Sequence, residues 1–174
     1  FTSSSLKHHT VLEKLVKGKS NWYIVDKQNR GRDISALLVA GKAYYNNYDY
    51  VCFVHDKKEK GSKLKESVHS WAHSMWGNML GSRNYICNIL RVFEENKSVG
   101  LCIPPAPLDK FVSAALINTW YSDYENTVKL AQKLKIRNIP DINEWPEAVG
   151  SVFWARVSAM KKLFEVDWSY DDFL

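Results

Sequence analysis

Three short apolar runs, separated by stretches with helical spacing, most strongly constrain what this chain can fold into. The runs cover Trp22–Val25, Tyr50–Val54 and Val99–Ile103. The second is a continuous series of β-branched, aromatic and other apolar residues, which is typical of a parallel strand buried on both faces. Strands that alternate with helices favour a parallel sheet with helices on both sides. The sequence therefore predicts an α/β fold with a mostly parallel sheet flanked by helices, in which these three strands are adjacent.

Six segments have the periodicity or the end signals of helices. Ser82 is expected to cap the helix that follows it, and Asp33 is placed to cap another or to stabilise its positive end. A further strand is predicted over Ser151–Ala155, and no element is predicted between Pro107 and Asn118. The expected helices are Leu6–Val16, Ile34–Tyr45, Trp71–Leu80, the segment after Ser82, Tyr124–Leu134 and Ser158–Phe164.

The charge of the chain limits the kinds of partner that it suits. Its 174 residues carry 24 Lys and Arg against 19 Asp and Glu, a net charge of +5. This charge suits nucleotide diphosphates, and it also suits peripheral association with an anionic membrane. The chain has no recognised stacking motif and no basic recognition helix, so we expect no nucleic-acid partner.

The cysteines indicate the compartment. Cys52, Cys87 and Cys102 lie in apolar stretches, and an odd number without metal-ligand spacing indicates reduced, buried thiols. We therefore expect a cytoplasmic location, extending to the inner face of the cytoplasmic membrane. No apolar run approaches the ~20 residues that a membrane-spanning helix needs.

The candidate site follows from the predicted sheet. Parallel sheets bind ligands beyond the carboxyl ends of their strands, which selects the turn after Val25 and the loop after Val54. Between them, a polar turn around Gly31 opens a helix that leads into a buried strand ending at Asp56. This order resembles the nucleotide-sugar core of GT-A glycosyltransferases, in which a strand-end Asp-x-Asp usually holds a divalent metal against the leaving diphosphate.

The strand end departs from that pattern, because it carries one acid where Asp-x-Asp has two. The developing charge of a leaving diphosphate must be met by a cation. We expect Lys57 and Lys58, with Arg30 or Arg32, to supply that charge without a metal cofactor. A divalent metal at Asp56 is the alternative.

Six motifs in order make the resemblance more specific. Together they resemble the rhamnan synthesis protein F family, whose members build rhamnose-containing cell-wall and O-antigen polysaccharides in bacteria. The resemblance runs from about Asn29 to Phe173. The motifs are Asn29–Ile34, Tyr48–Cys52 with His55–Lys58, Asn78–Ser82, Val99–Pro105, Gly150–Arg156 and Asp171–Phe173.

This resemblance implies one glycosyltransferase-like domain over residues 1–174, a fragment of a longer protein whose early strands are truncated at the N-terminus. It implies a dTDP-rhamnose-like donor, a lipid-linked glycan acceptor and transfer with inversion. Inversion needs one general base to deprotonate the acceptor hydroxyl. The family motif places Asp172 slightly ahead of Asp171 for this role. The donor side would be formed by Asn29, Arg30, Arg32, Asp33, His55, Asp56, Lys57 and Lys58.

Each of these assignments has a structural alternative. Arg30 and Arg32 could grip phosphates or be surface charges beside a turn. Asp33 could bind a sugar hydroxyl or cap its helix, and the two tail acids could be exposed charges. On the acceptor side, Trp154 beside Arg156 could stack on a sugar or pack in the core. The alternative function is a non-catalytic module that binds glycan or a partner enzyme in polysaccharide assembly.

Overall fold

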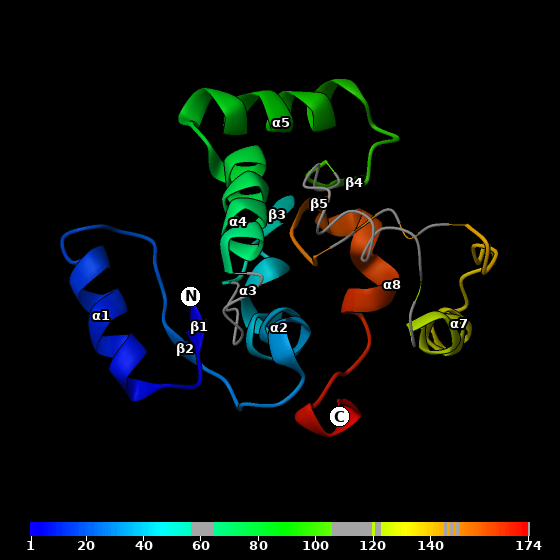
Figure 1. The fold of residues 1–174 in the computed structure, drawn as a ribbon, viewed down its shortest axis with the longest axis horizontal. Helices are drawn as coiled ribbons and strands as arrows, with labels where there is room; N and C mark the ends of the chain where they lie inside the picture. Colours follow the sequence, from blue (N-terminus) through cyan, green and yellow to red (C-terminus); the bar gives the residue numbers. More distant parts are fainter. Residues whose placement is uncertain are drawn as a thin grey trace.

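The computed structural model describes residues 1–56, 65–105, 120, 123–144, 146, 148 and 150–173. Its described strands form two small sheets (Figure 1). In the first, β1 (Thr2–Ser3) pairs in parallel with β2 (Val25–Asp26). In the second, β5 (Phe153–Arg156) lies between β3 (Tyr50–Phe53) and β4 (Leu101–Cys102) and is antiparallel to both.

The predicted mostly parallel, GT-A-like sheet is therefore wrong. The run around Val25 belongs to a different sheet from Tyr50 and Leu101, so the three expected strands are not adjacent. The strands β3 and β4 do point the same way, since both oppose β5. The late strand β5 enters between them in the opposite direction. Apolar runs indicate that a strand is buried on both faces but carry no information on the order of strands or the direction of a neighbour.

The three-stranded sheet is buried because alternate side chains face two separate clusters, as the period of a β-strand requires. On one face, Phe153 and Ala155 pack with Leu37, Leu38 and other residues of the larger cluster. On the other face, Cys52 and Trp154 pack against α4 (Lys65–Leu80) through Ala72, Met75 and Met79. The sheet is thus the middle layer between α4 and the helices of the larger cluster.

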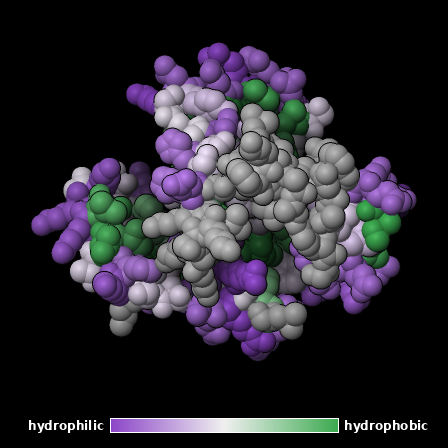
Figure 2. Space-filling view, viewed as in Figure 1, coloured by the Kyte–Doolittle hydropathy of each residue, from purple (hydrophilic) through white to green (hydrophobic). Residues whose placement is uncertain are grey.

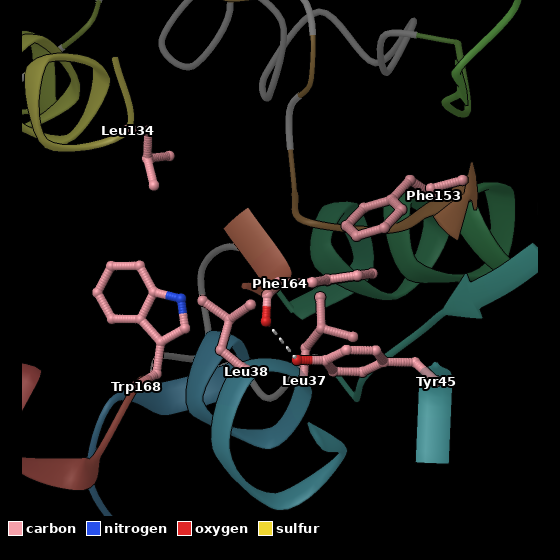
Figure 3. Packing of buried hydrophobic residues seen from close by; sticks show 8 residues of the cluster. Leu37, Leu38, Tyr45, Leu134, Phe153, Phe164 and Trp168 are labelled. Carbon is pink, nitrogen blue, oxygen red and sulfur yellow. Dashed lines mark hydrogen bonds between the residues drawn. The ribbon is translucent and has the colours of Figure 1, made fainter. Parts of the chain in front are cut away.

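The larger cluster joins the segment after β2 to the C-terminal helices. Figure 3 shows Leu37, Leu38 and Tyr45 facing Phe164 and Trp168 across this core. The Tyr45 and Phe164 rings stack with centroids 4.0 Å apart, and the Tyr45 hydroxyl donates to the Phe164 carbonyl at 3.5 Å. The segment between β2 and β3 is therefore packed against β5, Phe164 and Trp168.

Most helix predictions are confirmed. The first helix, α1, spans Leu6–Val16, and Ser82 caps α5 (Arg83–Glu95) by accepting a hydrogen bond from the Tyr85 N–H at 3.1 Å. The predicted helix over 34–45 forms as three short pieces, of which the middle one is π-helical, and Gly41 is a turn residue before the last piece. The segment 107–118 lies outside the described residues. The remaining helices are α2 (Arg32–Ser35), η1 (Ala36–Ala40), α3 (Lys42–Tyr45), α7 (Asp123–Lys133), η3 (Val157–Met160), α8 (Lys161–Phe164) and η4 (Tyr170–Asp172).

All three cysteines are unpaired. Cys52 lies on β3 against α4, and burial raises the pKa of its thiol to about 12. Cys102 is partly buried, and burial raises its pKa as well, whereas Cys87 is exposed on α5. The thiols of Cys52 and Cys102 therefore stay protonated at neutral pH and behave as small apolar side chains.

Candidate functional site

A cavity of about 810 Å³ opens between α1, β1, the start of α2, the end of β3 and α4. Five of the eight residues predicted on the donor side line it. These come from two segments that are far apart in the sequence, and the fold brings them to one place. The five are Asn29, Arg32, Asp33, His55 and Asp56.

The turn before α2 directs the first three of these residues. Gly31 has φ +71° and Arg32 has φ +45°, so two consecutive residues adopt left-handed backbone. The fully buried Ser35 fixes this turn, because its hydroxyl donates to the Arg30 carbonyl at 2.5 Å and also faces the Arg32 carbonyl at 3.2 Å. A non-glycine residue held at positive φ is unusual and often lies at a functional site. The strained turn presents the Arg32 side chain to the cavity.

His55 links the two segments of the cavity wall. Its Nδ1 lies 3.5 Å from the Asp33 carboxylate and 2.8 Å from the Asp56 carbonyl, while its Nε2 lies 2.6 Å from the Gly150 carbonyl. The His55 side chain is 8% exposed and that of Asp33 is 39% exposed. Both ring nitrogens of His55 therefore lie within hydrogen-bonding distance of oxygen atoms. The N-cap of α2 is Gly31, and Asp33 lies within the first turn, so Asp33 is not the capping residue and its carboxylate lies 3.5 Å from His55 Nδ1.

Lys27, which none of the sequence motifs includes, also lines the cavity. Its Nζ donates to the Gln28 carbonyl at 2.8 Å and lies 3.5 Å from that of Arg30. Burial lowers the pKa of Lys27, and the negative charge of Asp33 opposes that shift. The feature of the sequence that could have identified Lys27 is its position two residues before Asn29. The N-terminal part of the wall, from Phe1 to Ser4 and on α1, has no motif that would have revealed it.

The acidic tail lies against the same turn from outside. The Arg30 guanidinium donates to the Asp171 carboxylate at 2.9 Å and to the Phe173 carbonyl at 2.7 Å. A Cβ atom on Gly31 would lie 2.7 Å from the Phe173 ring, so the tail packs directly on the turn. Asp171, with a side chain that is 91% exposed, therefore stands beside the cavity wall, although it does not line the cavity.

Asp172 faces the other way. Its carboxylate accepts hydrogen bonds from the Ser169 N–H at 2.9 Å and the Ser169 hydroxyl at 3.0 Å, which closes a capping box around η4. It also lies 3.5 Å from Lys133 Nζ. These hydrogen bonds, with Lys133, hold the pKa of Asp172 below its usual value. The residue ranked first as a base is thus engaged in holding the tail.

The lowered pKa of Asp172 predicts how the stability of the tail depends on pH. A carboxyl group whose pKa is lower in the folded state stabilises the fold above its usual value, near 3.8, and loses that contribution as the pH falls through the lowered value. We expect Asp172→Asn to lower the melting temperature at pH 7, and the difference from the unsubstituted protein to vanish as the pH falls through the lowered pKa of Asp172. Melting curves from pH 7 to pH 2.5 would measure this. Asp49→Asn, at an exposed position before β3, is the control, and a difference that persists undiminished at the lowest pH would contradict the assignment.

The two residues predicted on the acceptor side lie away from the cavity. Trp154 donates from Nε1 to the Met79 carbonyl at 3.0 Å and packs against α4. Arg156 donates to the Phe93 carbonyl at 2.5 Å, the Val99 carbonyl at 3.3 Å and the Tyr50 hydroxyl at 3.2 Å. Both side chains thus tie helices to the sheet, and the structure does not bring them together with His55 or Asp33.

Two further predictions concern cations. Lys57 and Lys58 lie outside the described residues. Among the residues that are described, no group of three or more His, Cys, Asp and Glu side chains is arranged to hold a metal ion. Arg30 is described and is engaged with the tail.

No helix within the described part of the chain is both long enough and apolar enough to span a bilayer.

Comparisons with known proteins give the same family that the motifs in the sequence resemble. A model of the family described as rhamnan synthesis protein F matches residues 1–174. An uncharacterized protein named WxcX, from Xanthomonas campestris pv. campestris strain B100, is 31% identical over 142 residues, which are 79% of this chain and 18% of that protein. Its counterpart in strain ATCC 33913 is 30% identical over the same shares. The chain therefore matches less than a fifth of the length of these relatives, and no solved structure matches it significantly.

Proposed function

We propose, on the premise that the chain belongs to the rhamnan synthesis protein F family, that it forms the donor-binding part of a glycosyltransferase. Membership of this family assigns the chain a role in the synthesis of rhamnan and related polysaccharides. The proposed reaction transfers a sugar from a nucleotide diphosphate donor, of the dTDP-rhamnose type, to a hydroxyl of a lipid-linked glycan. The single observation that carries the proposal is the meeting of the 29–33 turn and the 55–56 strand end in one cavity.

The chemistry of the cavity wall supports a diphosphate ligand. Arg32 can make charge-assisted, bidentate hydrogen bonds to phosphate oxygens. Lys27 lies in the same wall, as do the imidazoles of His8 and His55. The two acids, Asp33 and Asp56, suit the hydroxyl groups of a sugar or ribose, because ionised carboxylates accept hydrogen bonds only.

We assign the general base to Asp171 ahead of Asp172. A base must be able to approach the acceptor hydroxyl, and the Asp171 carboxylate, which pairs with Arg30 beside the cavity wall, is 91% exposed. Asp172 accepts the hydrogen bonds of the capping box and faces Lys133. This reverses the order that the family motif suggested.

Isothermal titration of the full-length protein with dTDP-rhamnose and with dTDP tests the proposal. We expect Arg32→Ala to weaken binding by about 10- to 100-fold, because it removes charged hydrogen bonds to the diphosphate. Arg91→Ala, on the exposed side of α5, is the matched control and should leave the affinity unchanged. Melting curves of both variants would show whether they remain folded.

Two outcomes would redirect the proposal. Binding that disappears with EDTA and returns with Mg²⁺ or Mn²⁺ would make Asp56 a metal ligand, and Lys57 and Lys58 would then not be the main counter-charges. Binding of rhamnose-containing oligosaccharide without any binding of nucleotide would favour the non-catalytic module.

A further inference from the structure

A basic groove of about 800 Å³ lies at the opposite end of the domain from α1, between the end of α7 and α8. Its described lining carries four cationic side chains, Lys133, Lys135, Arg137 and Lys162, against one acidic side chain, Glu165. Neither the proposed donor site nor the tail accounts for this concentration of charge.

Part of this charge is neutralised within the protein. Lys133 lies 3.5 Å from Asp172 and over the Trp168 ring, and Glu165 lies 3.5 Å from Lys161. Lys135 and Arg137 are both exposed, and no ion pair between described residues involves them or Lys162. Lys162 Nζ donates to the Lys135 carbonyl at 2.7 Å, which holds α8 beside the segment after α7. Three positive charges therefore face outward from one short stretch of surface.

Apolar side chains are exposed among these charges. Ile136 lies between Lys135 and Arg137 and is 39% exposed, and Ile142, farther along the chain and next to the exposed Asp141, is 59% exposed. Leu130 lies on α7, one helical turn before Leu134, and is 38% exposed. Figure 2 shows a hydrophobic patch bordered by hydrophilic residues over the segment that follows α7, at the right-hand edge of the view. Large aliphatic side chains that alternate with cations are costly in water but suit the interface of a lipid bilayer.

We infer that the 130–142 segment and Lys162 form a surface that docks on an anionic lipid bilayer. The cations would meet lipid phosphates while Ile136 and Ile142 enter the headgroup region. A soluble anion would use the cations but would leave the isoleucines in water, and a nucleic acid would do the same. The combination of charge and exposed aliphatic groups therefore favours a membrane. This inference goes beyond the proposed transfer reaction and does not depend on it.

The test is vesicle co-sedimentation with the full-length protein. Vesicles of phosphatidylcholine with 30% phosphatidylglycerol, an assay composition of about the charge of a bacterial leaflet, are compared with pure phosphatidylcholine. We expect binding to the anionic vesicles, and we expect the triple variant Lys135→Gln, Arg137→Gln, Lys162→Gln to bind roughly 100-fold more weakly. The matched control, Lys7→Gln, Lys14→Gln, Lys17→Gln, removes the same charge from α1 and its C-cap and should bind like the unsubstituted protein.

A second variant separates a membrane from a soluble anion. Ile136→Ser with Ile142→Ser, which removes the aliphatic groups without a change of charge, should also weaken vesicle binding, while a site for a soluble phosphate would keep its affinity. Equal loss in the α1 control would overturn the inference, since it would show that net charge alone decides. Full binding by the triple variant, or displacement of the protein from vesicles by millimolar inorganic diphosphate but not by equal ionic strength of chloride, would overturn it as well.

Discussion

Replacing Asp171 by asparagine in the full-length protein should lower the rate of sugar transfer by about 10²- to 10⁴-fold, the usual effect of losing a general base. Asparagine keeps an oxygen that can accept the 2.9 Å hydrogen bond from Arg30, so the tail should stay on its turn. Donor affinity and melting temperature should therefore hardly change. Single-turnover rates with dTDP-rhamnose, together with donor titration, would measure the two effects separately.

Asp172→Asn is the control for this prediction. It removes a carboxylate from the neighbouring position and weakens the capping box, but it leaves Asp171 and Arg30 in place. We expect it to lower the melting temperature and to retain most of the turnover. If Asp172→Asn abolished turnover and Asp171→Asn did not, the general base would be Asp172, as the family motif suggested. Normal turnover in both would direct the search to Asp33 and Asp56.

Phe93→Ala should produce the largest loss of stability, about 3–5 kcal/mol in the free energy of unfolding. Phe93 is fully buried, and its ring stacks on that of Tyr50 with centroids 5.1 Å apart. The Arg156 guanidinium lies 5.6 Å from the same ring and hydrogen-bonds to the Phe93 carbonyl. The substitution would leave a cavity where α5 meets β3 and β5, and the surrounding atoms could fill it only in part.

Urea unfolding followed by far-ultraviolet circular dichroism would measure this loss. Val92→Ala, at the preceding and 41% exposed position, should cost less than about 1 kcal/mol and serves as the control. Similar small losses in both variants would show that α5 is not anchored through Phe93. The assignment of Arg156 to this anchor, and not to an acceptor site, would then lose its support.

The elements of this fold could largely be predicted from the sequence, but their arrangement could not. The helical spacing of Leu6–Val16 and the cap at Ser82 are local features, and local features decide where helices begin and end. The order of the strands depends on contacts between distant segments. The partner of Val51 is Ala155, over a hundred residues away, and the apolar run of β3 would be equally well buried beside a parallel neighbour. The predicted parallel sheet failed at this point.

The segments of the candidate site could likewise be predicted from the sequence, but the contacts between them could not. The turn at 29–33 and the strand end at 55–56 are each visible as a motif, and the cavity brings them together. The contact between Arg30 and Asp171 joins residues that are 141 positions apart, so their pairing could not be inferred from spacing. Arg156 resembles a ligand-binding residue in the sequence because it is a charge beside Trp154. In the structure, three acceptors within the protein engage its guanidinium.

The most direct test of the account is hydrogen–deuterium exchange of the full-length protein with and without saturating dTDP-rhamnose. If the cavity binds the donor, the peptides that cover residues 27–36 and 52–56 should exchange more slowly in its presence, because their backbone forms the wall against the diphosphate. The peptides of α5 should exchange at an unchanged rate. Protection confined to other parts of the protein, under conditions in which the nucleotide sugar is shown to bind, would contradict the assignment of the donor site to this cavity.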